Sequence, residues 1–184
     1  YKRQACIGIP AGILAASHRK LNRVTQALID TLQTLPSFVY LIPVVMLFRV
    51  GDFAAMLAVI AYSLAPAIRY TILGIEQVPT HLIEAARAIG CTRTQIRWRI
   101  ELPIALPQIM LGINQTIMMA LSMLVITALV GTRDLGQEVY IALTKADTGR
   151  GIIAGIGVAC IAIVADRLIN RWAQRKRMEF GLQS

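Results

Sequence analysis

The sequence predicts an all-α protein, a polytopic membrane helix bundle of about five spans. Of its 184 residues, 56% are hydrophobic and only 16% are charged, whereas a soluble domain carries about 25% charged residues. The mean hydropathy is +0.60. The stretch at 108–130 contains no charged residue, and a helix that crosses roughly 30 Å of hydrocarbon needs about 20 apolar residues. Composition and this stretch together indicate a membrane protein.

Five apolar stretches are expected to form the spans, at residues 4–17, 31–48, 53–68, 108–130 and 151–165. The second and fourth reach the usual threshold of about 18 residues, and the other three have a length at which a buried helix of a soluble protein competes with a span. Arginines beside the short stretches can extend to the headgroups and lengthen them. Four prolines lie in or near these stretches, so we expect kinked helices.

The distribution of basic residues predicts the orientation. Five alternating crossings place the loops at 18–30, 69–107 and 167–184 on one side, and these loops hold 13 of the 19 Lys and Arg residues. Basic residues in short loops stay preferentially in the cytoplasm, so this side is expected to be cytoplasmic. No Met opens the chain and an apolar stretch begins almost at once, so we expect the sequence to lack its natural beginning.

The segment 76–107 is expected to be a cytoplasmic loop with two short helices, inside a single domain of residues 1–184. The first helix is predicted to begin at Pro79 and Thr80 and to end at Gly90, since glycine best adopts the left-handed conformation that closes a helix. Thr92 and Gln95 have the spacing of a capping box for the second helix.

Two prolines follow this second helix. Because proline lacks a backbone N–H and clashes with the preceding turn, Pro103 and Pro107 are expected to block a simple continuation of the helix. The chain is then redirected into the span at 108–130.

Glu84 is the candidate docking residue of the loop. Its carboxylate can accept charge-assisted hydrogen bonds from a partner protein, and the small side chains of Ala85 and Ala86 allow a close approach. The alternative is a solvated helix in which Glu84 pairs with Arg87 three residues later.

The spacing of seven residues in the loop resembles the EAA signature of ABC importer permeases, and the order of the spans resembles the type I permease core. Blocks at 34–43, 71–79 and 114–123 are similar to the glycine betaine/proline (quaternary amine) branch of that family. Seven residues match the signature, and the resemblance implies that they couple the permease to its ATPase. They are Glu84, Ala85, Ala86, Gly90, Ile100, Leu102 and Pro103.

This resemblance implies an inner (plasma) membrane permease subunit of bacterial type. It would pair with itself, contact cytoplasmic ABC ATPase subunits and receive a compatible solute such as glycine betaine, proline or choline from an extracytoplasmic solute-binding protein. ATP and Mg would be bound by the ATPase, so this chain is expected to bind no cofactor and not to be an enzyme.

Polar and aromatic side chains within the spans are candidates for the translocation path, since polar groups in hydrocarbon are costly unless they face the bundle or water. Tyr40 and Tyr62 can offer ring faces to a quaternary ammonium ion. The alternatives are helix–helix hydrogen bonds and interfacial anchoring by the tyrosines. The candidates in the longest span are Asn114, Gln115, Met118 and Ser122.

No catalytic or metal-binding motif accompanies these features. The three cysteines are isolated, only two histidines exist, and neither a phosphate-binding glycine loop nor an HExxH sequence is found.

Two other functions compete with the permease. A membrane-tethered helix-turn-helix regulator would use Arg93, Arg97 and Arg99 on DNA, although no nucleic-acid partner is expected so close to apolar spans. A secondary transporter or channel without an ATPase predicts intramembrane carboxylates or an inverted repeat, and neither is clear in the sequence.

Overall fold

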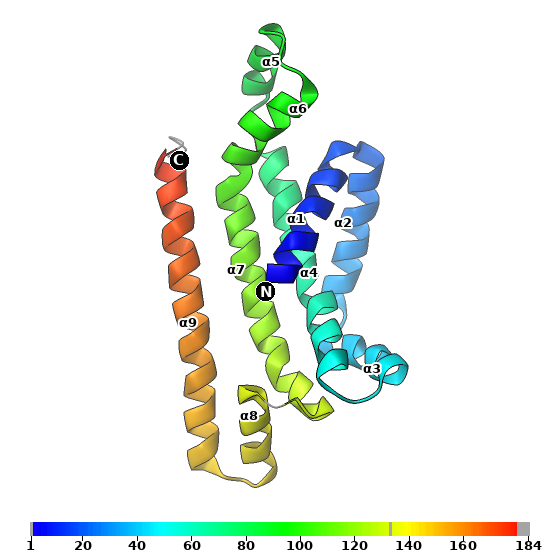
Figure 1. Cartoon of the computed structure of the whole chain (residues 1–184), viewed down its shortest axis with the longest axis vertical. Coiled ribbons are helices and arrows are strands. Elements are labelled where there is room, and N and C mark those ends of the chain that lie inside the picture. The colour runs from blue at the N-terminus through cyan, green and yellow to red at the C-terminus, as the bar shows by residue number, and fades with distance from the viewer. Residues whose placement is uncertain (1, 133, 180–184) are drawn as a thin grey trace.

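The computed structural model describes residues 2–132 and 134–179, and in these ranges every regular element is helical. The long helices run side by side in alternating directions, and a short helical elbow protrudes from one end (Figure 1). This confirms the all-α bundle. The elements are α1 (Lys2–Ser17), α2 (Arg19–Thr34), α3 (Ser37–Phe48), α4 (Asp52–Glu76), α5 (Thr80–Ala88), α6 (Arg93–Ile96), the π-helical turn η1 (Arg97–Glu101), α7 (Leu102–Thr127), the 3-10 turn η2 (Ala128–Val130), α8 (Leu135–Thr144) and α9 (Thr148–Glu179).

Three helices of the described chain are long and apolar enough to cross a membrane: Asp52–Glu76, Arg93–Val130 and Thr148–Arg175. The segments Lys20–Thr34 of α2 and Ser37–Phe48 of α3 pass the same test together as a bent pair, which is the geometry of a broken span or of a re-entrant loop, and the apolar part of α1, Ile7–Ser17, is shorter. In Figure 1 these elements follow one another in alternating directions, and the elbow joins α4 to α7. The element order therefore matches the order predicted for five crossings.

The apolar stretch predicted as a span at 31–48 is broken at Pro36, one of the prolines at which a kink is expected, and the bend is much sharper than a kink. The helix breaks between Thr34 and Ser37, and the two parts are bent by 95°. Proline disfavours the helical conformation of the residue before it, and Leu35, which precedes Pro36, is extended at φ −74° and ψ 134°. As a result the segment 18–30, expected to be a loop, is mostly α2, which lies beside α4 in the bundle.

The prediction that Pro103 and Pro107 block the helix is wrong, because the chain stays helical from Arg93 to Val130. The π-helical turn just before the prolines explains the continuity. There Leu102 N–H donates to the Arg97 carbonyl, one residue further back than in an α-helix. Pro103 then lies at the start of α7, where a missing N–H is tolerated. A π-helical turn is a common way for a helix to accommodate a local change of geometry.

Helix α4 lies at the centre of the bundle because small residues let its neighbours approach closely. A Cβ added to Gly112 of α7 would lie 2.6 Å from Tyr70 Cβ, and one added to Gly74 would lie 3.0 Å from the Ala105 carbonyl oxygen. On the α1 side, a Cβ on Gly12 would lie 2.6 Å from Thr71 Cβ. These contacts hold both neighbouring helices on α4.

Helix α2 turns polar side chains towards α4, around the buried Ile29. Arg69 of α4 donates to Asp30 Oδ1 at 3.1 Å and to Gln33 Oε1 at 2.7 Å, and Asn22 donates to Glu76. The side chains of Arg69 and Asp30 are themselves 46% and 60% exposed.

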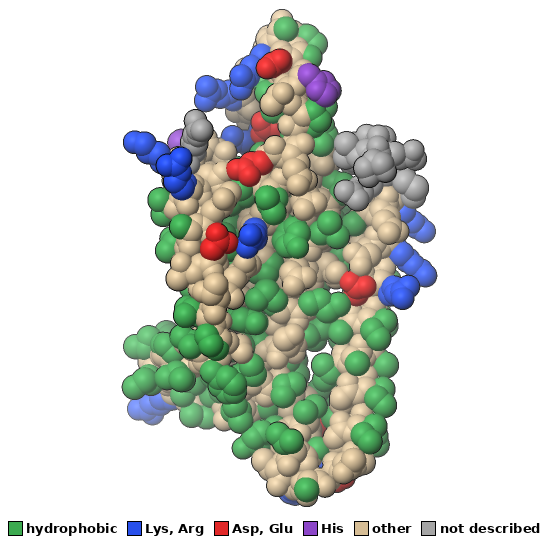
Figure 2. Space-filling view, turned by 180° about the vertical axis from the view of Figure 1, so that it is seen from behind, with side chains coloured by type: hydrophobic (Ala, Val, Ile, Leu, Met, Phe, Trp, Pro, Cys, Tyr) green, Lys and Arg blue, Asp and Glu red, His purple; other side chains and the backbone are tan. Residues whose placement is uncertain are grey.

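The other side of α2 carries an exposed apolar stripe of Leu21, Val24, Leu28 and Leu32. Such a stripe is not expected on a helix of a water-soluble protein. Figure 2 likewise shows hydrophobic side chains over much of the outer surface.

Candidate functional site

Helix α5 ends in the left-handed glycine that the sequence predicts. Gly90 has φ +88°, and its N–H donates to the Arg87 carbonyl at 2.9 Å, while Cys91 N–H donates to the Ala86 carbonyl at 3.0 Å. These two bonds form a Schellman motif, which satisfies the last carbonyl groups of the helix. The elbow between the two short helices therefore has a defined geometry.

The second half of the elbow begins with the predicted capping box, which the structure confirms. Thr92 N–H donates to Gln95 Oε1 at 2.8 Å, and Gln95 N–H donates to Thr92 Oγ1 at 3.3 Å. The helix that starts here is the one that continues as α7 to Val130. The second half of the elbow is therefore continuous with α7.

The candidate docking face of α5 is accessible. Glu84 and Ala85 are exposed, Ala86 is buried, and Ile89 at the end of the helix is 83% exposed. Among the residues with described side chains, no ion pair joins Glu84 to Arg87, so the local pairing considered for this carboxylate is not formed. The Glu84 carboxylate is therefore available to a partner protein. Helix α5, which carries it, is the part of the molecule that protrudes furthest from the bundle (Figure 1).

The remaining signature residues lie at the root of the elbow and not on α5. Ile100, Leu102 and Pro103 are partly buried where η1 passes into α7, and Arg97 Nε lies 3.7 Å from Glu101 Oε2. The structure thus separates the signature into an exposed part, Glu84 to Gly90, and an anchoring part at the root.

Asn114, a candidate path residue, bridges two helices. Its Nδ2 donates to Asp166 Oδ1 of α9 at 2.7 Å, and Asn170 Nδ2 donates to the same oxygen at 2.8 Å. This geometry favours the helix–helix alternative for Asn114. The buried Oδ1 of Asn114 has no partner among the described atoms. Sequence reasoning missed the role of Asp166, although a carboxylate and an amide four residues apart beside an apolar stretch were a usable signal.

The other candidates on α7 divide by exposure. Gln115 and Ser122 are exposed, and Met118 is partly buried. The Ser122 hydroxyl donates to the Met118 carbonyl at 3.0 Å, which satisfies it within its own helix. Of this group, Gln115 has the free polar side chain best suited to face a solute or a second copy.

The structure brings Tyr40 and Tyr62 together. Their ring centroids lie 5.4 Å apart with the planes at 72°, and the Tyr40 hydroxyl donates to the Leu32 carbonyl. Both rings pack on a small cluster of buried side chains, Leu41, Ala58, Met123 and Val130. The pair is an edge-to-face contact across α3 and α4 with ring area left partly exposed.

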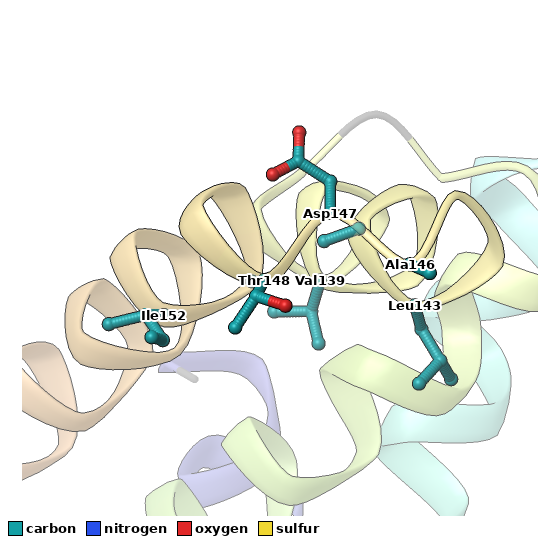
Figure 3. A pocket seen from close by; sticks show the side chains of 8 residues that line it. Val139, Leu143, Ala146, Asp147, Thr148 and Ile152 are labelled. Carbon is teal, nitrogen blue, oxygen red and sulfur yellow. The ribbon is translucent and has the colours of Figure 1, made fainter.

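A groove of about 480 Å³ lies between α8 and α9, at the end opposite the elbow (Figures 1 and 3). Val139, Leu143 and Ile152 make it apolar, and the Asp147 carboxylate points away from Val139 and Leu143 in Figure 3. That carboxylate accepts the Arg150 N–H at 3.1 Å and caps α9. The groove has no aromatic lining, so it lacks the ring faces that hold a quaternary ammonium ion. Nowhere in the described ranges do three His, Cys, Asp or Glu side chains group as metal ligands.

Comparison with known families gives one extensive match. A model described as "binding-protein-dependent transport system inner membrane component" matches residues 8–178.

Individual relatives are similar over most of this chain. It is 43% identical over 171 residues to the glycine betaine transport system permease protein OpuAB of Bacillus subtilis, covering 93% of this chain and 61% of that protein. It is 44% identical over 162 residues to the glycine betaine/proline betaine transport system permease protein ProW of Escherichia coli, covering 88% and 46%. The glycine betaine/carnitine/choline permease OpuCD of B. subtilis is 33% identical over 173 residues, covering 93% and 75%. The chain therefore spans only part of the length of OpuAB and ProW.

Two solved structures share the fold. A permease chain of the MetNI methionine ABC transporter in an inward-facing conformation aligns with a TM-score of 0.82 at 21% identity, covering 94% of this chain and 87% of that chain. A chain of an amino acid ABC transporter with histidines gives 0.74 at 22% identity, covering 94% and 86%. At these identities the similarity concerns the fold alone.

Proposed function

The chain belongs to the family of inner membrane components of binding-protein-dependent transport systems, and from this premise we propose that it is the translocation subunit of an ATP-driven importer. The observation that carries the proposal is the exposed elbow of α5, which joins α4 to the uninterrupted helix Arg93–Val130 at the end rich in basic residues. A protruding, conformationally defined helix between two spans is suited to receive movement from a cytoplasmic partner.

The partners follow from this geometry and from the relatives. An ATPase subunit is proposed to hold α5 in a groove, where Glu84 accepts hydrogen bonds from basic side chains. A solute-binding protein is proposed to meet the opposite end, and a second copy of this chain to complete the path. ATP and Mg belong to the ATPase, and the permease itself hydrolyses nothing.

The solute is proposed to be a compatible solute of the glycine betaine, proline or choline type. The printed names of the relatives, at 43% and 44% identity, support this class. The candidate path residues of this chain for such a solute are Gln115 and the exposed ring area of Tyr40 and Tyr62, since ring faces attract quaternary ammonium groups.

The mechanism assigned to this chain is a lever. When the ATPase subunits close, α5 moves, and the capping box at Thr92 and the helix from Arg93 onwards carry that movement to α7. Helix α4 moves with it, because Gly74 and Gly112 hold the two helices in close contact. A rigid-body tilt of this pair against the rest of the bundle would switch access between the two sides.

A secondary transporter without an ATPase is the second candidate, because Asp166 is the intramembrane carboxylate that this function predicts. Two side-chain amides already donate to its Oδ1. A structural role, in which Asp166 holds α9 on α7, explains this arrangement. The two functions are separated by solute uptake into proteoliposomes that contain the permease alone. Uptake that needs the ATPase supports the importer, and uptake without it supports the secondary transporter.

The docking proposal is tested by charge reversal in proteoliposomes that contain the permease, its ATPase and its binding protein. Glu84→Lys is expected to lower ATP-dependent uptake by at least tenfold, because a like charge in the groove costs several kcal/mol, whereas Glu84→Gln should lower it less. Asp52→Lys, a reversal at the opposite end of the bundle, is the matched control for ATPase binding, which it should leave unchanged. Unchanged uptake and ATPase binding in Glu84→Lys would remove Glu84 from the docking contact.

A further inference from the structure

A small pocket of about 240 Å³ lies where α1 meets the root of the elbow. One wall comes from the α1–α2 junction and the other from α6 and η1. We call it the junction pocket, and its lining residues are Ser17, His18, Arg93, Thr94, Arg97 and Trp98. None of these residues belongs to the coupling signature or to the candidate path.

The junction pocket is electropositive. Arg93, Arg97 and His18 are among its lining residues. Arg97 has a counter-charge in Glu101, whose Oε2 lies 3.7 Å from its Nε, and the terminal nitrogens of Arg97 are not part of this contact. Within the set of described side chains, Arg93 forms no ion pair. Two arginines that line one cavity can supply several N–H donors to a phosphate group.

The depth of the pocket follows from the packing of α1 on α4. Gly12 lies against Thr71, and both helices run towards the same end (Figure 1), so Ser17 lies level with Glu76, the last residue of α4. The 25 residues of α4 span about 37 Å, slightly more than the roughly 30 Å of a hydrocarbon core. The end of α4, and with it the junction pocket, is therefore at the depth of the lipid headgroups.

The surroundings of the pocket are those of the membrane interface. Trp98 is 65% exposed, and tryptophan is enriched at headgroup level. Leu14 is 62% exposed and lies on the same side of α1 as Ser17, the last residue of that helix, which follows it by three residues. An exposed apolar side chain directly below a basic pocket suits a molecule with a charged head and an acyl chain.

We propose that the junction pocket binds the phosphate group of an anionic phospholipid from the cytoplasmic leaflet. The headgroup phosphate accepts hydrogen bonds from Arg93 and Arg97, and the acyl chain follows α1 past Leu14. A lipid held in this way links the α1–α2 junction to the root of the elbow. The lipid composition of the leaflet then biases the position of the helix that carries movement from α5 to α7.

Lipid binding to the purified full chain tests the proposal independently of transport. Native mass spectrometry with phosphatidylglycerol and phosphatidylcholine gives a dissociation constant for each lipid. Arg93→Gln combined with Arg97→Gln is expected to weaken phosphatidylglycerol binding about fivefold per arginine and to weaken phosphatidylcholine binding less, because the choline cation offsets the charge of its phosphate. Arg171→Gln, which removes one charge near the end of α9 outside the pocket, is the control and should change little.

Three results would overturn the assignment. The first is an equal loss in Arg171→Gln, which would mean general attraction to basic residues. The second is full displacement of phosphatidylglycerol by inorganic phosphate at equal concentration, which would make the pocket a free-anion site. The third is unchanged binding in Arg93→Gln alone, a variant that keeps the Arg97–Glu101 pair and so remains informative if the double variant misfolds, as judged by circular dichroism.

Discussion

At the residue scale, Gly90 is held in place by backbone conformation alone. Its φ is +88°, and an added Cβ would find no atom within 4 Å. Gly90→Ala is therefore expected to lower the free energy of unfolding by about 1–2 kcal/mol, the cost of a left-handed non-glycine residue. Denaturant unfolding of the full chain in mixed micelles measures this change.

The matched control for this change is Gly155→Ala in α9, where an added Cβ also meets no atom within 4 Å but the backbone is helical. Alanine there should be neutral or stabilising by up to about 1 kcal/mol. Equal effects of the two substitutions would show that the elbow does not depend on a left-handed residue.

The contact between Asn114 and Asp166 is the second prediction at this scale. A double-mutant cycle with Asn114→Ala and Asp166→Ala is expected to give a coupling free energy of about 0.5–1.7 kcal/mol, the range measured for hydrogen bonds between membrane helices. Unfolding in mixed micelles again supplies the four free energies. Additive effects of the two substitutions would mean that this bond does not hold α9 on α7.

Local chemistry explains which site residues the sequence could predict. The capping box of Thr92 and Gln95 and the left-handed Gly90 depend on neighbours within a few positions, so residue type and spacing were sufficient. The partner of Asn114 lies 52 positions away, and the contact between Tyr40 and Tyr62 depends on the bend before α3. Such contacts need the packing of whole helices, which a single sequence does not reveal.

At the element scale, α2 is the helix whose location the amino-acid composition predicted least well. Its polar residues contact Arg69 and Glu76 of α4, so part of the polarity that suggested a cytoplasmic loop is used in contacts between two helices. The exposed leucines are left for the hydrocarbon. Pro103 is a second position at which a sequence rule failed. Proline usually interrupts a helix, but here a π-helical turn precedes it and the helix continues.

Cysteine accessibility tests the placement of α2. In a background without Cys6, Cys91 and Cys160, Leu28→Cys is expected to resist a membrane-impermeant maleimide in inverted vesicles, because its side chain faces acyl chains. Arg23→Cys, on the same helix, should react. Equal labelling of the two positions in these inverted vesicles would mean that both lie in water and that α2 is a cytoplasmic segment.

At the scale of the whole molecule, the order of the long helices was predictable from the sequence, because each hydrophobic stretch marks its helix independently of the others. The orientation, with the basic loops in the cytoplasm, stays a prediction. The 95° bend between α2 and α3 and the central place of α4 were not predictable, since they arise from contacts between segments. The similarity to the MetNI permease fold, with a TM-score of 0.82, concerns this overall arrangement.

If α5 meets an ATPase on the cytoplasmic side, cross-linking in the assembled transporter should capture the contact. In the same cysteine-free background, a short bifunctional reagent is applied to two variants, Ala88→Cys on α5 and Leu143→Cys at the opposite end of the bundle. We expect an adduct between Ala88→Cys and the ATPase subunit and none from Leu143→Cys. An ATPase adduct from Leu143→Cys, with none from Ala88→Cys, would rule out α5 as the docking helix.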